Sequence, residues 1–398
     1  MTTTTLSTEE QTSAAVRIAE PEYRICVKTV MDTSDPNITF DANGVCNHVE
    51  TYNLAAAKHV LTGDQGTEML LATVDRIKKH GRSGKYDCIL GLSGGVDSTY
   101  LCLLAKQHGL RPLVVHFDNG WNSELAVHNI ENTVRNLGFD LYTYVVDWPE
   151  FRDLQRAYIK AHVIDIEVLT DHGFMAVLYE QAKKHRIKFV LGGMNVVTEG
   201  ILPTNWIYSK ADLVNIKAIH TAHGDIATNK LGSYPFLSPM RRKVMQRLVG
   251  LEVISPLNWM DFTYDKVKAE ITSDLGWRDY GGKHYESIFT RFYQGYILPE
   301  KFGIDKRRAH LSTLVCSDQM SRDQAMDRMS QPGYDSDQCA IDKPFVLKKL
   351  GFQADEFDEY IAAPRVEHKD YPHWKSVFQI YPWLNQMRSI ARGLRRSA

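Results

Sequence analysis

The middle of the chain alternates between short apolar runs and longer stretches in which apolar residues recur at helical spacing. Four short segments rich in apolar residues, at 88–92, 112–117, 141–148 and 188–193, predict strands, and the first is a continuous apolar run typical of a strand buried on both faces. Gly109 and Gly138 follow two of the helical stretches, and glycine is the residue type that most often ends a helix. Strands that alternate with helices of this length predict an α/β fold with a doubly wound parallel sheet.

The sequence on either side of this alternation has a different texture. Residues 1–20 are polar and predict a disordered leader, while turn-forming residues dominate 21–62 and predict a small N-terminal module. The alternating domain then occupies 63–235. Residues 236–398 are more basic and aromatic, and they predict a mainly helical C-terminal region. Its last part, 388–398, carries four arginines and is interpreted as a solvated helix.

The most informative local pattern is LGLSGGVDST, which joins the first predicted strand to the helix after it. Gly94 and Gly95 allow the backbone to bend tightly and to approach an anion, and the hydroxyls of Ser93 and Ser98 can donate to phosphate oxygens. The helix N-terminus adds partial positive charge. Asp97 would either hold Mg²⁺ against the phosphates or cap the helix. This segment therefore predicts a phosphate-binding loop.

The loop lacks the Gly-Lys-Ser/Thr of a Walker A motif and matches the SGGxDS signature of the PP-loop ATP pyrophosphatases. That family has an adenine-nucleotide alpha-hydrolase-like fold and cleaves ATP between its α- and β-phosphates, which leaves AMP on the substrate. The alternative is an ordinary glycine turn in a doubly wound sheet. The strand before the motif and the helix after it favour the nucleotide site.

Residues at the ends of other strands are expected to complete the nucleotide site, because open parallel sheets bind ligands beyond their carboxyl ends. Besides the loop itself, the candidates for cofactor binding are Thr99, His116, Phe117, Asp118, Gly192 and Gly193. The two last glycines are equally compatible with tight packing in the sheet.

Beyond the loop, five long blocks of sequence resemble the N-acetyl sugar amidotransferases of bacterial surface-polysaccharide biosynthesis, including that of the lipopolysaccharide O-antigen. The blocks are VMDTSDPNITFDANGVCNH, LSGGVDSTY, HFDNGWNSELAVHNI, LGGMNVVTEGIL and LGWRDYGGKHYESIFTRFYQGYILPEKFGIDKRRAHLS, at 30–48, 92–100, 116–130, 191–202 and 275–312. The resemblance covers nearly the whole chain after the leader.

The resemblance implies that an acetamido group on a nucleotide-linked sugar is converted to an acetamidino group. ATP would adenylate the amide oxygen, and ammonia would then displace it as AMP. An electropositive site would stabilise the phosphates. The candidate cations are Lys283, Arg291, Lys306, Arg307 and Arg308, and any one of them could instead lie on a solvated face. Asp97, Lys306, Arg307 and Glu199 are the candidate catalytic residues, and Glu199 or Asp118 could position ammonia or Mg²⁺.

The resemblance also implies partners. No cysteine follows Met1 to act as an N-terminal glutaminase nucleophile. Ammonia is therefore expected from a separate glutaminase that resembles the one of imidazole glycerol phosphate synthesis, with its cyclase-like companion.

Two CxxC pairs in the family pattern would form a zinc site, but here each pair keeps one cysteine. Cys26 is followed by Thr29 and Cys46 by Val49. Closed structural zinc sites almost always use four protein ligands. We therefore expect a metal-free module.

Composition narrows the function further. The formal net charge is −1, which does not predict a nucleic-acid partner. No apolar run approaches the roughly 18 residues of a membrane helix, and the few scattered cysteines suit the cytoplasm. Two alternatives remain: a PP-loop ligase or thiolase that acts on tRNA, which the neutral charge disfavours, and a non-catalytic nucleotide-binding assembly subunit, which the intact loop disfavours.

Overall fold

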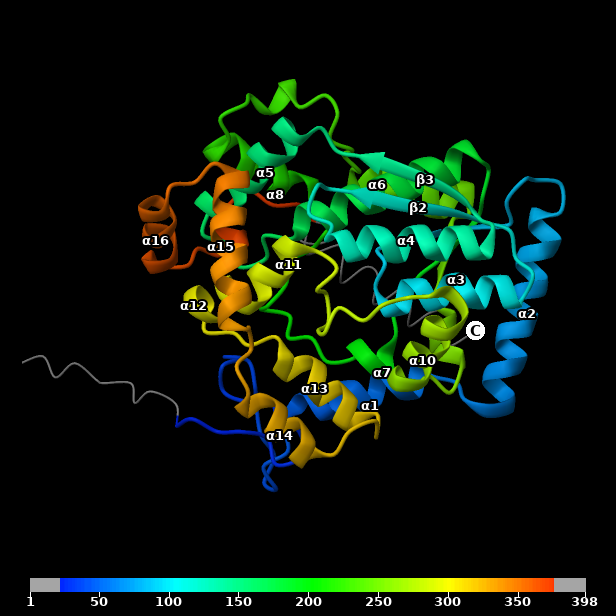
Figure 1. Ribbon diagram of the computed structural model, residues 1–398, viewed down its shortest axis with the longest axis horizontal. Coiled ribbons are helices and arrows are strands. Elements are labelled where there is room, and N and C mark those ends of the chain that lie inside the picture. The colour runs from blue at the N-terminus through cyan, green and yellow to red at the C-terminus, as the bar shows by residue number, and fades with distance from the viewer. Residues whose placement is uncertain (1–21, 376–398) are drawn as a thin grey trace, which may run out of the picture.

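A computed structural model describes residues 22–375, apart from the side chains of residues 248 and 249 (Figure 1). The predicted leader, 1–20, and the arginine-rich end, 388–398, lie outside the described residues. None of the helices within 22–375 is long and apolar enough to cross a membrane.

The centre of the protein is a parallel sheet of five strands in the order β3-β2-β1-β4-β5. The strands are β1 (Cys88–Gly91), β2 (Pro112–Asp118), β3 (Asp140–Val145), β4 (Phe189–Leu191) and β5 (Glu252–Ile254). The predicted α/β fold and its four strands are confirmed. The fifth strand was not predicted, because three residues between Gly250 and Pro256 show no periodicity. The sheet therefore extends beyond 235, where the sequence placed the end of this domain.

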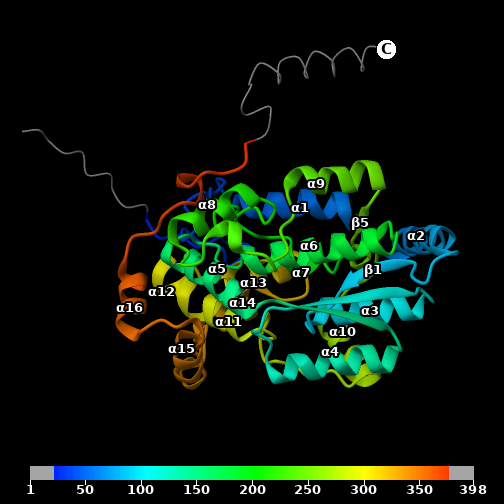
Figure 2. The ribbon, with the colours of Figure 1, turned by 90° about the horizontal axis from the view of Figure 1, so that it is seen from above.

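Helices cover both faces of the sheet, as Figure 2 shows. They are α2 (Gly63–Gly81), α3 (Val96–Gln107), α4 (Glu124–Leu137), α5 (Trp148–Lys160) and α6 (Val168–Lys184). Successive residues of β1 point to opposite faces, so Ile89 packs in the core with Val177 of α6, and Leu90 packs in the other core with Leu101 of α3. Burial on both faces explains the continuous apolar runs of β1 and β2, whereas β3, at the edge of the sheet, is largely exposed.

The rest of the described chain is mainly helical, as the sequence predicts for its C-terminal region. These helices are α1 (Asn47–His59), α7 (Val196–Glu199), α8 (Leu213–His223), α9 (Pro239–Val244), α10 (Tyr264–Leu275), α11 (Ile288–Phe292), α12 (Leu298–Phe302), α13 (Arg307–Cys316), α14 (Arg322–Ser330), α15 (Ser336–Leu350) and α16 (Ala354–Ala362). Two of them position the candidate site: α10 packs on α3 and α4, and α13 packs on α7.

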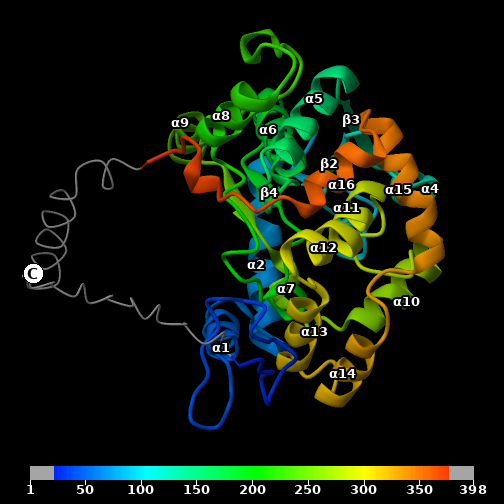
Figure 3. The same cartoon turned by 90° about the vertical axis from the view of Figure 1, so that its left-hand side faces the viewer.

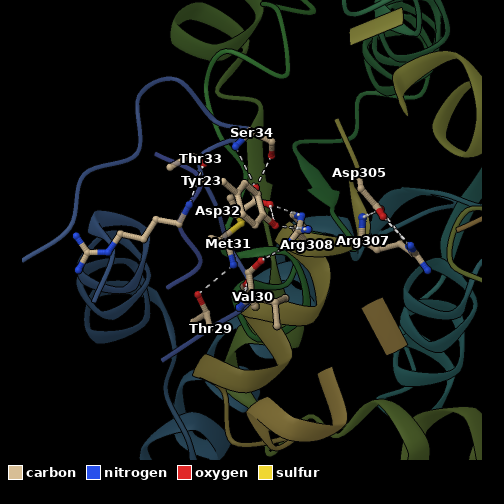
Figure 4. Close-up of polar contacts among 12 residues, drawn as sticks. Tyr23, Thr29, Val30, Met31, Asp32, Thr33, Ser34, Asp305, Arg307 and Arg308 are labelled. Carbon is tan, nitrogen blue, oxygen red and sulfur yellow. Dashed lines mark hydrogen bonds and ion pairs between the residues drawn. The ribbon is translucent and has the colours of Figure 1, made fainter. Parts of the chain in front are cut away.

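The described part of the predicted N-terminal module, residues 22–62, is joined to α13 by an ion pair whose carboxylate is buried. Arg308 Nε lies 2.9 Å from Asp32 Oδ2, and Arg308 Nη1 donates to the Val30 carbonyl at 2.8 Å (Figure 4). Tyr23 donates its hydroxyl to the same Asp32 carboxylate at 2.8 Å. Figure 3 shows the module beside α13 and α14. The module and the C-terminal region are therefore packed against each other.

The four positions of the expected CxxC pairs are all buried. Cys26 and Cys46 are free cysteines, and the Cys46 amide donates to Cys26 Sγ at 3.2 Å. The Thr29 hydroxyl lies 3.9 Å from Cys46 Sγ. His48, a possible third ligand, instead contacts Asp35 at 2.6 Å. Within 22–375 no three histidine, cysteine or acidic side chains are grouped to hold a metal ion. A metal-free module stays a prediction.

Candidate functional site

The predicted phosphate-binding loop, residues 93–98, lies at the carboxyl end of β1, the central strand of the sheet. The chain leaves β1 for β2 on one side and later returns to β4 on the other side. In open α/β sheets this reversal of strand order marks the crevice where ligands bind. Gly193, just after β4, faces the loop, since a Cβ built there would lie 3.6 Å from Asp97 Cβ. The fold therefore places the loop at the expected binding edge.

The loop has the open backbone geometry of an anion site. Gly94 has a φ of +88°, which a residue with a side chain rarely adopts. The Ser93 amide donates to Ser98 Oγ, and the Gly95 amide donates to Ser93 Oγ, both at 3.3 Å. These contacts are long for hydrogen bonds and stay within the loop. A phosphate oxygen could replace them without breaking a contact to another element.

Asp97 fits a magnesium site better than a helix cap. Gly95 occupies the N-cap position of α3, so Asp97, the second residue of the helix, is not its N-cap residue. Asp97 Oδ1 is buried and has no hydrogen-bond partner among the described residues. Burial raises the pKa of Asp97 to about 7. An orphaned carboxylate oxygen beside a phosphate loop is the kind of ligand that Mg²⁺ prefers, so the residues present fit the ion.

Glu199 ends α7 and is paired with cations from a distant segment. Lys283 Nζ lies 2.9 Å from Glu199 Oε1, and His284 Nε2 lies 4.0 Å from the same oxygen. Burial alone would raise the pKa of Glu199, but the charges of Lys283 and His284 outweigh it and lower the pKa to about 2. The charges of Lys283 and Glu199 also act on Asp97, together with Glu286. The loop is thus bordered by carboxylates and one lysine.

His310 of α13 supports the end of α7. Its Nδ1 lies 3.1 Å from the Thr198 carbonyl, and because a carbonyl only accepts, Nδ1 carries the proton. Lys283 Nζ approaches the same carbonyl at 3.4 Å. Burial and the neighbouring Lys283 charge lower the pKa of His310 to about 3. His310 is therefore a neutral imidazole next to Glu199.

Replacing His310 with glutamine is expected to flatten the pH dependence of stability. The folded protein keeps His310 neutral down to about pH 3, whereas an unfolded histidine binds a proton near pH 6.5, so stability is lost as the pH falls below 6.5. At pH 5 the wild-type histidine should lower the free energy of unfolding by up to about 2 kcal/mol. Urea unfolding at pH 5 and pH 8 measures the difference. Equal pH dependence in both proteins would contradict the environment described for His310.

The three residues predicted at the end of β2 have different surroundings. His116 Nδ1 donates to the Leu92 carbonyl at 2.9 Å, and Asn122 donates to His116 Nε2 at 2.9 Å. Asp118 accepts from the Gly120 amide at 2.8 Å. Phe117 is buried and stacks on Tyr144. His116 and Asp118 therefore shape the backbone next to the loop, while the Phe117 ring belongs to the core.

Of the remaining candidates for cofactor binding, some belong to the packing of the fold and one lies beside the loop. Thr99 is fully buried in α3, and its hydroxyl has no partner among the described residues. The Gly192 amide donates to the Ile254 carbonyl at 2.7 Å, so this glycine continues the pairing of β4 with β5. The structure thus favours sheet packing for Gly192 and a place beside the loop for Gly193.

Most of the predicted phosphate-binding cations have other partners. The Arg307 guanidinium binds Asp305 at 2.6 Å and the carbonyls of α14 (Figure 4). Arg291 binds Asp342 at 2.7 Å, and Arg308 holds the N-terminal module. The charge of Lys306 acts on Glu167, at the start of α6. Among the five candidate cations, Lys283 is the one whose charge acts on Asp97 and Glu199.

Several residues of the site were missed at the sequence level. Trp277 Nε1 and the Tyr280 hydroxyl both donate to the Gly94 carbonyl, at 2.8 and 3.0 Å. A Cβ at Gly95 would lie 3.1 Å from Glu286 Oε1. In the sequence, these residues were marked only by their place in the 275–312 block of resemblance. The same is true of His284 and His310. Nothing in the order of residues shows that this block reaches back to the loop.

Comparison with known proteins adds a family for part of the chain. Residues 286–385, which include α11 to α16, match the family described as "LPS biosynthesis protein WbpG-like, C-terminal domain". The uncharacterized protein MJ1599 of Methanocaldococcus jannaschii is 26% identical over 264 residues, which cover 64% of this chain and 76% of that protein. The tRNA(Ile)-lysidine synthase of Chlamydia pneumoniae is 26% identical over 170 residues, 42% of this chain and 47% of that enzyme.

Two solved structures are similar over about half of the chain. The NMN synthetase from Francisella tularensis shares 15% identity with a TM-score of 0.28, over 53% of this chain and 86% of that one. The NH3-dependent NAD synthetase from Campylobacter jejuni shares 16% identity with a TM-score of 0.29, over 52% of this chain and 84% of that one. The match to the WbpG-like family of LPS biosynthesis thus concerns the C-terminal region, which packs beside a five-stranded parallel sheet that carries the SGGxDS loop.

Proposed function

We propose that this protein is an ATP-dependent amidotransferase of the carbon-nitrogen ligase type, which forms AMP and pyrophosphate. Its substrate would be a nucleotide-linked N-acetyl sugar, and its product would be the acetamidino sugar for the lipopolysaccharide O-antigen. The observation that supports this most is the Asp97 oxygen, which has no hydrogen-bond partner among the described residues and lies in the SGGxDS loop near Lys283 and Glu199. The family match supports the biosynthetic context.

The chemistry needs ATP because an amide carbonyl is a poor electrophile. The amide oxygen attacks the α-phosphorus, a new P–O bond forms, and the bond between the α- and β-phosphates breaks to release pyrophosphate. Ammonia then adds to the activated carbon. The C–O bond breaks, and AMP leaves with the former amide oxygen. Each step separates or moves negative charge, so fixed cations and amides at the phosphates lower the barrier.

The residues of the site divide these tasks. The loop amides and the hydroxyls of Ser93 and Ser98 would bind phosphate oxygens at the N-terminus of α3. Mg²⁺, when bound, would neutralise phosphate charge, and Asp97 and Glu199 are the carboxylates that would hold it. Lys283, now paired with Glu199, could turn to the departing pyrophosphate. Glu199 would also attract the ammonium ion that supplies ammonia.

The partners follow from the same chemistry. Ammonia would come from a separate glutaminase with a cyclase-like companion, as the family resemblance implies. The reaction would take place in the cytoplasm, where ATP and nucleotide sugars are available. No nucleic acid or membrane contact is part of the proposal.

Purified protein tests the proposal directly. It would be incubated with ATP, Mg²⁺, ammonium chloride and a panel of UDP- and CMP-linked N-acetyl sugars, and the products would be analysed by mass spectrometry. The proposal expects one sugar in which NH replaces one oxygen, with AMP and pyrophosphate in equal amounts. A parallel reaction would contain tRNA in place of the sugars, and modification of that tRNA without a sugar product would favour the ligase alternative. ATP binding without turnover of any substrate would favour an assembly subunit.

A further inference from the structure

A row of asparagines on α4 holds the segment that follows α10. Asn129, Asn132 and Asn136 are three and four residues apart, so they lie on one face of the helix. Asn129 both donates to the Arg278 carbonyl at 2.8 Å and accepts from the Arg278 amide at 2.9 Å. Asn132 and Asn136 donate to the carbonyls of residues 276 and 275, at 3.3 and 3.0 Å. Side chains of α4 thus replace the helix hydrogen bonds that end with α10.

Residues 277–287, which we name the strap, are fixed at their far end as well. Asn122 and Ser287 form a β-bridge, and the Ser123 amide donates to the Glu286 carbonyl at 2.9 Å. The Ile288 amide donates to the Trp121 carbonyl at 2.9 Å. The strap is therefore held at both ends by the β2–α4 connection and α4, and it passes over the phosphate loop between them.

Two side chains near the start of the strap bind one carbonyl of the loop. Trp277 Nε1 and the Tyr280 hydroxyl donate to the Gly94 oxygen, and the two rings contact each other edge to face at 5.7 Å. Trp277 is 2% exposed, so its indole N–H cannot donate to solvent water in place of the Gly94 carbonyl. Asn129 forms hydrogen bonds with the backbone of Arg278, which lies between these two residues in the chain. The position of both donors is consequently fixed by α4.

Holding this carbonyl sets the direction of the next amide. In a planar trans peptide the C=O and the N–H point in opposite directions. Because the Gly94 oxygen faces the strap, the Gly95 N–H faces away from it, to the side of the loop where Ser93 Oγ accepts it at 3.3 Å. A glycine pair with φ of +88° at Gly94 could otherwise flip its peptide at little cost.

We propose that Trp277 and Tyr280 are positioning residues of the phosphate site, which hold the Gly94–Gly95 peptide so that the Gly95 amide faces the phosphates of ATP. The proposal rests on the use of ATP given under "Proposed function", but not on the identity of the sugar. It assigns the strap to the binding of the phosphate chain and leaves adenosine to other parts of the site.

Ligand affinities of strap variants test this assignment. Tyr280→Phe and the double variant Trp277→Phe/Tyr280→Phe would be compared with wild type by calorimetry, using ATP, pyrophosphate and adenosine as separate probes. Loss of both donors is expected to weaken ATP and pyrophosphate binding about thirtyfold, which corresponds to two hydrogen bonds of roughly 1 kcal/mol each, while adenosine affinity stays unchanged. With a turnover assay, KM for ATP should rise while kcat changes little.

Tyr285→Phe is the matched control, because Tyr285 lies in the same strap and its hydroxyl makes no hydrogen bond among the described residues. Its ATP affinity should equal that of wild type. Unchanged pyrophosphate affinity in both strap variants would overturn the proposal. An equal loss for adenosine and pyrophosphate would overturn it too, because that result indicates general damage to the fold. A wild-type protein that binds neither ATP nor pyrophosphate would instead contradict the proposed function itself.

Discussion

Asp97→Asn is expected to lower AMP formation by about a thousandfold and to leave the protein folded. The amide has nearly the same shape as the carboxylate but cannot neutralise a magnesium ion held against the phosphates. Removal of one well-placed electrostatic group from an active site commonly costs 10²- to 10³-fold in rate. Release of AMP from ATP in the presence of ammonium and substrate, followed by chromatography, measures the effect.

Stability separates a catalytic role of Asp97 from a structural one. Burial raises the pKa of Asp97 to about 7, so its ionised form is unfavourable in the empty protein. The neutral amide should therefore keep or slightly raise the melting temperature. Asp64→Asn is the matched control, since Asp64 is an exposed aspartate in the first turn of α2. Wild-type AMP formation by Asp97→Asn would refute the role given to Asp97.

Asp32→Ala is expected to lower the free energy of unfolding by about 3–5 kcal/mol, because it leaves Arg308 buried without its partner. The Asp32 side chain is 2% exposed and the Arg308 side chain 16% exposed, so water can replace the lost carboxylate only in part. The same substitution also removes the acceptor of the Tyr23 hydroxyl. Urea denaturation with a change in midpoint and a constant slope would measure the loss.

An exposed ion pair provides the control for this prediction. Glu252 and Arg76 lie 2.6 Å apart but are 45% and 49% exposed, so Glu252→Ala should cost less than about 1 kcal/mol. If Asp32→Ala cost no more than Glu252→Ala, the N-terminal module would not be fastened to α13 as described. ATP affinity of the folded Asp32→Ala protein should equal that of wild type, because no hydrogen bond or ion pair among the described residues joins Asp32 or Arg308 to the loop.

The fold was largely predictable because its strands carry continuous apolar runs. Runs of four or more residues between turn signals predicted β1 to β4, whereas β5 has three residues and exposed Glu252 and Val253. Its pairing depends on the position of β4, which is a tertiary contact. Local patterns therefore predicted β1 to β4, whose own residues favour strands. They missed β5, which forms a strand because it pairs with β4.

The phosphate loop was predictable for a similar reason: its chemistry lies in six consecutive residues. The strap was not, because Trp277 and the Gly94 carbonyl that it binds are 183 residues apart. The partners of the basic residues were also not predictable from the sequence. Arg307 and Arg308 are adjacent in a basic run, yet one binds Asp305 and the other binds Asp32. The order of residues does not show that Asp305 and Asp32, and not phosphates, would bind these guanidinium groups.

The central claim is that ATP adenylates the amide oxygen of the substrate, and oxygen tracing tests it most directly. A nucleotide-linked N-acetyl sugar with ¹⁸O in its acetamido carbonyl would be converted by the purified protein with ATP, Mg²⁺ and ammonium. The account predicts that the label appears in AMP and that pyrophosphate remains unlabelled. Release of ADP with labelled inorganic phosphate, or recovery of the label in water, would contradict it.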